Sequence, residues 1–296
     1  MIRTSHSHSE SCLTQAQHDY DLSTTNKNFF LKQVIETFLV NPFFAIIFIA
    51  IASSLLGVFV LWKKLSYFGD ALSHSILLGL VLGATIELNQ VWAIVFFATF
   101  FAFLVRLISQ NRYFSKDVIV MILSYFCVAL AVIFNDLWLK NFSFSSYIFG
   151  DILTATNLDV VALVTISLVT IFYVIFAFKK ILLINTSEDL AKIEGVKIEF
   201  WNLSFLILLS VVVALSVRIV GVFLMTALLI LPAAIARIFS VSAKQMMLLS
   251  PIIATLIAAF SFKAASAYDL TISSAIVVIF STIFVASLGV KKIFLK

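Results

Sequence analysis

The sequence has few charged residues, which make up 12% of its 296 positions, against about 25% in a typical soluble domain. Hydrophobic residues account for 62%, and the mean hydropathy is +1.13. A chain with this composition cannot cover a water-exposed surface with polar groups, which excludes a cytosolic enzyme and a disordered tail protein. The composition and the long apolar runs predict an all-α polytopic membrane protein.

Several common functional patterns are also absent. The two cysteines, Cys12 and Cys127, cannot build a disulfide framework. The sequence contains no GxxxxGK[ST] phosphate loop and no HExxH, GxSxG or CxxC pattern. The chain therefore does not bind ATP through such a loop and carries no familiar hydrolase motif. Its net charge of +5 does not indicate nucleic acid, because Lys and Arg sit in short clusters between apolar runs.

The chain divides into a polar extension over residues 1–35 and a membrane domain over residues 36–296. The extension lacks the apolar core of a signal peptide, and its composition favours disorder. Its SHSHSE stretch and Cys12 could capture zinc, but a non-essential tail is the simpler interpretation.

Apolar runs long enough to cross a hydrocarbon core of about 30 Å are abundant. Two of them meet at Arg218 with almost no loop between them, so the sequence predicts eight or nine transmembrane helices. Residues 136–156 are too polar to span. The candidate spans are 41–62, 68–86, 91–110, 117–135, 157–178, 200–217, 219–236, 245–262 and 271–289.

Lys and Arg are concentrated in alternate loops, which predicts the orientation of the chain. The bias places the C-terminus and the 179–199 loop in the cytoplasm. With nine spans the N-terminal extension is outside, and with eight it is inside.

One pair of ionisable residues stands inside an apolar span. Asp70 precedes His74 by four residues in YFGDALSHS, so both side chains share one helix face. Counting a helical rise of about 1.5 Å per residue from Lys64 puts His74 roughly 15 Å into the membrane. Carboxylate oxygen and imidazole nitrogen suit a divalent metal site. A proton relay uses the same residue types, and a purely structural pair is the third interpretation.

Three weaker features accompany this pair. FGD recurs as IFGDILT (148–154), which makes Asp151 a candidate for the outer mouth of a path, although chance similarity explains a match this short. Pro232 predicts a kink or gate in 219–236. Ser187 and Gly195 predict a short capped helix over 188–194, which is either a handle for a soluble partner or a plain connector.

These motifs resemble the permease family of ABC importers for zinc, manganese and iron. Matching stretches are LGVFVLWKKLSYFGDALSHSILLGLVLG (56–83), with its GDALSH core, SYIFGDIL (146–153) and VGVFLMTALLILPAAIARI (220–238). The segment EDLAKIEGV (188–196) resembles the short cytoplasmic coupling helix that contacts the ATPase. The chain departs from the family near YDLTISSAIVV (268–278), where a Pro-Ser-Gly-like turn is usual.

The resemblance implies a homodimer in a bacterial inner membrane, two cytoplasmic ATPase subunits and a soluble metal-binding protein. It implies no permanently bound cofactor, zinc as the transported ion, and Asp70 and His74 along its path. Manganese or iron transport and proton-coupled secondary transport remain alternatives. The implied ATPase contacts are Glu188, Asp189, Leu190, Ala191, Lys192 and Gly195.

Overall fold

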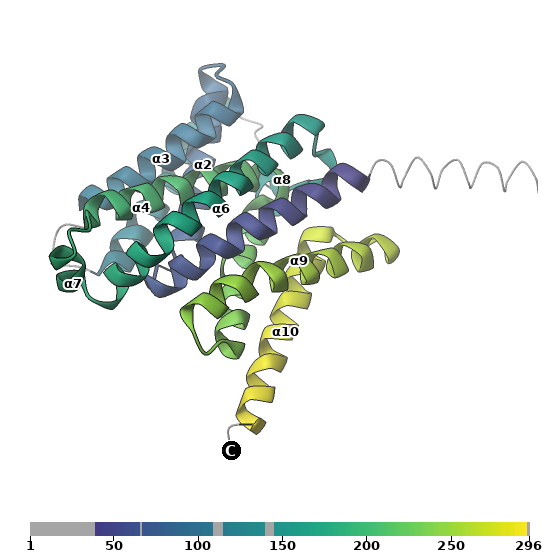
Figure 1. Cartoon of the computed structure of the whole chain (residues 1–296). Coiled ribbons are helices and arrows are strands. Elements are labelled where there is room, and N and C mark those ends of the chain that lie inside the picture. The colour runs from purple at the N-terminus through teal and green to yellow at the C-terminus, as the bar shows by residue number, and fades with distance from the viewer. Residues whose placement is uncertain (1–38, 66, 109–114, 140–144, 295–296) are drawn as a thin grey trace, which may run out of the picture.

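The computed structural model describes residues 39–65, 67–108, 115–139 and 145–294, and these segments form helices joined by short turns (Figure 1). Eight of the described helices are long and apolar enough to cross a membrane, which confirms the predicted all-α polytopic fold. The predicted N-terminal extension lies outside the described residues. The elements are Leu39–Trp62, α2 Phe68–Thr85, α3 Gln90–Ile108, α4 Lys116–Phe134, η1 Asn135–Leu139, α5 Ser145–Phe149, η2 Ile152–Thr154, α6 Asn157–Thr186, α7 Glu188–Ile193, α8 Ile198–Phe239, α9 Ala243–Ala267 and α10 Ile272–Phe294.

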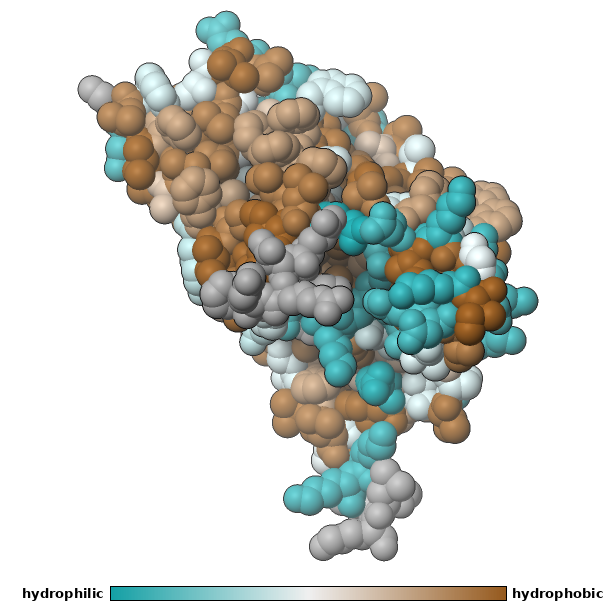
Figure 2. Space-filling model, turned by 90° about the vertical axis from the view of Figure 1, so that its left-hand side faces the viewer, coloured by the Kyte–Doolittle hydropathy of each residue, from teal (hydrophilic) through white to brown (hydrophobic). Residues whose placement is uncertain are grey.

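The outer surface of the bundle is apolar as well as its interior. Large side chains such as Phe96, Phe172 and Phe176 are exposed, and brown hydrophobic atoms cover much of the molecule in Figure 2. Such a surface is favourable in hydrocarbon and unfavourable in water. Several buried hydroxyl groups donate to a carbonyl of their own helix, as when Ser53 donates to the carbonyl of Ile49 at 2.6 Å.

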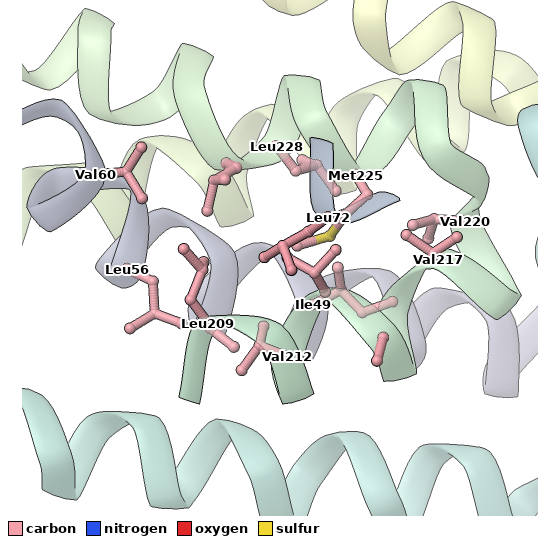
Figure 3. Close-up of a cluster of buried hydrophobic side chains, with 14 of the residues drawn as sticks. Ile49, Leu56, Val60, Leu72, Leu209, Val212, Val217, Val220, Met225 and Leu228 are labelled. Atoms are coloured by element: carbon pink, nitrogen blue, oxygen red, sulfur yellow. The ribbon is translucent and has the colours of Figure 1, made fainter. Parts of the chain in front are cut away.

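Helix α8 is the central element, and its 42 residues would extend about 63 Å if straight, about twice the hydrocarbon thickness. It does not run straight, because Gly221 has φ 78° and ψ 166°. Figure 3 shows Leu209 and Val212 on one arm facing Met225 and Leu228 on the other. The candidate spans 200–217 and 219–236 are therefore the two arms of one element that folds back at Gly221.

A contact between two glycine backbones holds this fold-back. A Cβ atom on Gly221 would lie 2.4 Å from the backbone nitrogen of Gly150, and one on Gly150 would lie 2.3 Å from the carbonyl carbon of Val220. Neither position leaves room for a side chain. The hydroxyl of Ser273, in the first turn of α10, donates to the Val220 carbonyl at 3.4 Å. The turn is thus packed between the segment after α5 and the start of α10.

The structure brings alternate loops to the same end of the bundle. At one end the side-chain amide of Asn41 donates to Asn157 at 2.8 Å. At the other end Lys64 lines a cavity together with Arg237 and Lys291.

Helix α6 is longer than the sequence predicts. It continues to Thr186, so the expectation of a loop from residue 179 is wrong. The ammonium group of Lys180 lies 4.5 Å from the centre of the Trp201 ring, and such stacking lets a lysine remain in a helix that packs against α8.

Candidate functional site

The predicted pair of Asp70 and His74 lies in the first two turns of α2. The Nε2 atom of His74 is 3.5 Å from a carboxylate oxygen of Asp70, as the i, i+4 spacing predicts. Asp70 stands in the first helical turn, where the positive end of the helix dipole favours a carboxylate. α2 packs against α3, α4 and α8, which fix its position in the bundle.

The pair is open on one side. The side chain of Asp70 is 53% exposed and that of His74 is 33% exposed, although most of α2 is buried. The Nδ1 atom of His74 is buried and has no hydrogen-bond partner among the residues that the structure describes. Within the described residues no group of three or more His, Cys, Asp or Glu side chains comes together. One chain therefore brings together two side chains, a carboxylate and an imidazole, of the types that can bind a metal.

The depth expected for the pair changes with the start of α2. Lys64 lies in the turn before α2, with φ 55°, and α2 itself begins at Phe68. His74 is therefore about 9 Å along α2, rather than the 15 Å that follows from one continuous helix after Lys64. Both residues lie in the first half of α2, which begins at the α7 end of the bundle.

Asp151 lies apart from this pair. Its carboxylate accepts a hydrogen bond from the backbone of Leu153 at 3.2 Å and caps η2. Gly150 touches Gly221, whereas Gly69, beside Asp70, faces Leu229, which is about 12 Å further along the second arm of α8. The two FGD copies also differ in conformation, because the first begins a helix and the second has Gly150 at φ 69°. Asp151 lines a separate cavity with Asp269.

Helix α7 has the predicted caps. The hydroxyl of Ser187 accepts a hydrogen bond from the backbone of Leu190 at 3.3 Å, and Gly195 follows the helix at φ 70°. Ala191 is fully buried, whereas Leu190 is 52% and Ile193 is 82% exposed. Glu188, Asp189 and Lys192 are also exposed, so α7 presents apolar and charged groups together.

The sharp change of direction in α8 occurs at Gly221 and not at Pro232. Gly221 has the only non-helical backbone angles inside α8, while Pro232 is buried within a continuous helical arm. A gating role for Pro232 therefore stays a prediction.

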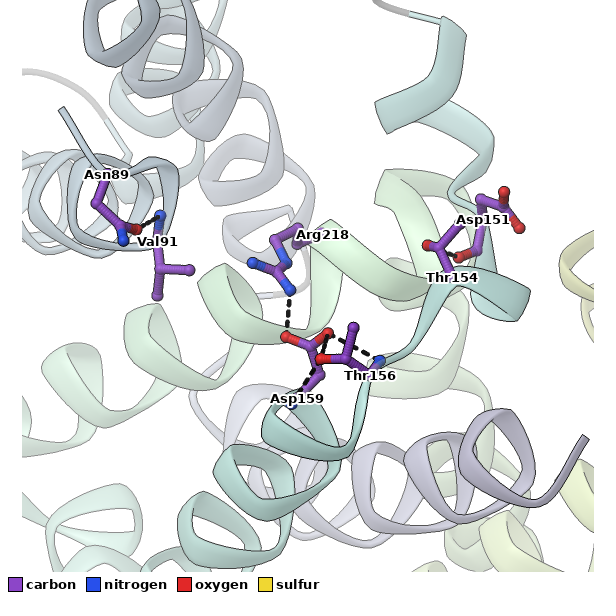
Figure 4. A network of polar contacts seen from close by, with 7 residues as sticks. All are labelled: Asn89, Val91, Asp151, Thr154, Thr156, Asp159 and Arg218. Atoms are coloured by element: carbon purple, nitrogen blue, oxygen red, sulfur yellow. Dashed lines mark hydrogen bonds and ion pairs between the residues drawn. The ribbon is translucent and has the colours of Figure 1, made fainter. Parts of the chain in front are cut away.

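An ion pair between two residues that no sequence motif links joins α6 to the first arm of α8. Figure 4 shows the guanidinium of Arg218 contacting the carboxylate of Asp159, which also accepts hydrogen bonds from Thr156. Burial raises the pKa of Tyr147 above its ordinary value of 10.0, and the nearby Arg218 opposes this effect. Arg218 thus ties the start of α6 to the region where α8 turns. Its partner is 59 residues away, beyond any local pattern.

The fold and the pair on α2 together define a class of protein: a polytopic helical membrane protein with an ionisable site on a spanning helix, which is typical of transporters. Residues 36–291 match the model of the ABC 3 transport family. The chain belongs to this family, and its resemblance to metal-importer permeases is confirmed.

Individual proteins agree with this assignment. The high-affinity zinc uptake system membrane protein ZnuB of Haemophilus influenzae is 32% identical over 244 residues, which cover 82% of this chain and 93% of that protein. The manganese import system permease protein ScaB of Streptococcus gordonii is 27% identical over 82% of this chain and 90% of that protein. A chain in the structure of PsaBC from Streptococcus pneumoniae with a Fab matches at a TM-score of 0.74 and 26% identity, over 84% of this chain and 90% of that one.

Proposed function

We propose that this protein is the membrane-spanning subunit of an ABC importer that moves a divalent metal ion, zinc in the first place, into the cytoplasm. The observation that carries the proposal is the Asp70–His74 pair, which is partly exposed on a membrane-spanning helix. A structural pair would be expected to be covered and fully hydrogen-bonded. Here the carboxylate is partly exposed, and the Nδ1 atom of His74 has no hydrogen-bond partner within the described segments, which favours a ligand role.

A second copy of the chain completes this site in our proposal. An ionisable pair exposed to hydrocarbon is costly, so a partner must cover it. Two-fold symmetry is the commonest arrangement of oligomers. If two copies face each other through the start of α2, they supply two carboxylates and two imidazoles. Four nitrogen and oxygen ligands match the tetrahedral coordination of zinc.

The energy source in this proposal is a separate cytoplasmic ATPase, because the sequence has no phosphate loop. Helix α7 is its proposed contact. The exposed Leu190 and Ile193 can enter an apolar groove, while the buried Ala191 transmits movement of the helix to the bundle. A soluble metal-binding protein would deliver the ion at the opposite end. Because Lys and Arg are concentrated at the α7 end, we place this end and the C-terminus on the cytoplasmic side of an inner membrane.

Zinc is favoured over manganese and iron by two observations. Imidazole ligands suit zinc well, and ZnuB proteins of Haemophilus influenzae and Buchnera aphidicola are named as zinc systems. Manganese is the alternative, since ScaB of Streptococcus gordonii is named as a manganese permease. Resident cofactors are not required by this mechanism.

The energy source of transport distinguishes an ABC importer from a secondary transporter. The permease would be reconstituted in liposomes with its ATPase, and entry of zinc, manganese and iron measured with the binding protein outside. We expect zinc entry that requires ATP and stops when the ATPase cannot hydrolyse it. Entry through the permease alone, driven by a proton gradient without ATP, would instead establish a secondary transporter.

A further inference from the structure

A polar cavity of about 700 Å³ opens where several helices end near α7. Three cationic side chains line it. Lys64 follows the helix Leu39–Trp62, Arg237 lies at the end of α8, and Lys291 lies at the end of α10. No acidic side chain lines it among the described residues. Figure 2, which faces the end of the molecule that carries α7, shows hydrophilic side chains gathered around a hollow.

The three cations are not neutralised by the described part of the chain. Elsewhere Arg106 pairs with Glu199 and Arg218 pairs with Asp159. Among the described residues, no ion pair involves Lys64, Arg237 or Lys291. Glu188 lines the adjoining cavity of about 540 Å³, which also contains Lys64. Like charges gathered in one cavity repel each other, so this arrangement favours an anion from outside the chain.

Two further groups point to the same ligand chemistry. The side-chain nitrogen of Asn185, which lines the cavity, is buried and has no hydrogen-bond partner in the described part of the chain. The N-terminus of α9, a helix of 25 residues, also opens into the cavity at Ser242 and Ala243, and its first turn contains no acidic residue. Its backbone amides and dipole favour negative charge. The amide, the helix end and the three cations thus supply donors suited to a phosphate group.

We propose that this cavity binds the phosphate of an anionic phospholipid, such as phosphatidylglycerol, from the leaflet at the α7 end of the bundle. The cavity combines its cations with apolar walls from Leu61, Leu182 and Met246, which suits a headgroup that carries acyl chains. Basic pockets between membrane helices on the cytoplasmic side recognise such headgroups. A free phosphate offers the same chemistry without the chains, and the test separates the two sources.

The test uses the full-length chain in detergent and measures its affinity for phosphatidylglycerol, for phosphatidylcholine with identical acyl chains, and for inorganic phosphate. Native mass spectrometry measures how much lipid is bound, and the rise in unfolding temperature on adding the ligand is an independent measure of binding. The cavity variant combines Lys64→Gln, Arg237→Gln and Lys291→Gln. We expect it to bind phosphatidylglycerol about a hundredfold more weakly, since each cation contributes about fivefold. Its affinity for phosphatidylcholine should not change.

A matched control removes the same charge outside the cavity through Lys179→Gln, Lys197→Gln and Lys292→Gln, and it should bind as the unaltered chain does. If the triple cavity variant fails to fold, Lys291→Gln against Lys292→Gln gives the same comparison, with about a fivefold loss expected only for Lys291. If inorganic phosphate raises the unfolding temperature of the unaltered chain but not that of the cavity variant, the site binds free phosphate.

Other outcomes overturn the proposal. They are an equal loss in the control and cavity variants, or equal affinity of the unaltered chain for both lipids. A third is a cavity variant that keeps its affinity for phosphatidylglycerol but no longer associates with the ATPase, because the cations would then belong to that interface.

Discussion

Replacing Gly221 by alanine tests whether the fold-back of α8 depends on close backbone packing. At φ 78° and ψ 166°, Gly221 occupies a region of backbone angles that is essentially restricted to glycine. An added Cβ would lie 2.4 Å from the nitrogen of Gly150 and equally close to the carbonyl carbon of Phe149. Both neighbours are backbone atoms, so they cannot move aside as a flexible side chain can.

The expected loss of stability has two parts. The strained backbone costs about 1–3 kcal/mol, and overpacking against a fixed backbone costs about 1–3 kcal/mol more. Together they predict a destabilisation of about 2–6 kcal/mol for Gly221→Ala. The two arms of α8 hold contacts with α2, α3, α9 and α10, so the damage should spread beyond the turn.

Two other glycines separate these effects. Gly195 also has a positive φ of 70°, but a Cβ there would meet nothing within 4 Å, so Gly195→Ala should cost only about 1 kcal/mol. A Cβ at Gly289 would likewise meet nothing, and alanine should stabilise that helix by up to about 1 kcal/mol. Thermal unfolding of the purified variants in one detergent measures all three. Equal unfolding temperatures for Gly221→Ala and Gly195→Ala would refute the packing argument.

Two further predictions concern the ion pair and α7. Arg218→Met should destabilise the chain by about 1–2 kcal/mol, which is less than for a fully buried pair because the arginine is partly exposed. Adding Asp159→Asn to this variant should cost little more stability in thermal unfolding, and losses that simply add would exclude a direct interaction. The double variant Leu190→Asp with Ile193→Asp should bind the ATPase at least tenfold more weakly in a pull-down. Its unfolding temperature should not change, because both side chains are exposed. Undiminished binding would place the ATPase contact elsewhere.

Local sequence signals predicted the elements whose causes are local. The hydrophobic runs located the spans because apolar length is what a membrane requires. Ser187 and Gly195 predicted α7 because a cap and a stop act within a few residues. The spacing of Asp70 and His74 placed them on one face for the same reason.

The features that the sequence did not predict depend on distant contacts. A single glycine between apolar residues in VRIVGVF carries no turn signature, and Gly221 adopts its angles beside Gly150, 71 positions earlier. Pro232 was the stronger local signal, yet α8 changes direction at Gly221. The extension of α6 to Thr186 similarly involves packing of Lys180 on Trp201.

The central claim is that Asp70 and His74 hold the transported ion, and zinc transport by site variants tests it most directly. The complete transporter would be reconstituted with radiolabelled zinc outside, carrying Asp70→Ala, His74→Ala or, as a control, Asp136→Ala, which removes an exposed acid from η1. We predict that ATP-dependent zinc entry is lost in the first two variants, while the complex still assembles, and is kept in the control. Zinc entry at the unaltered rate in His74→Ala would contradict the account.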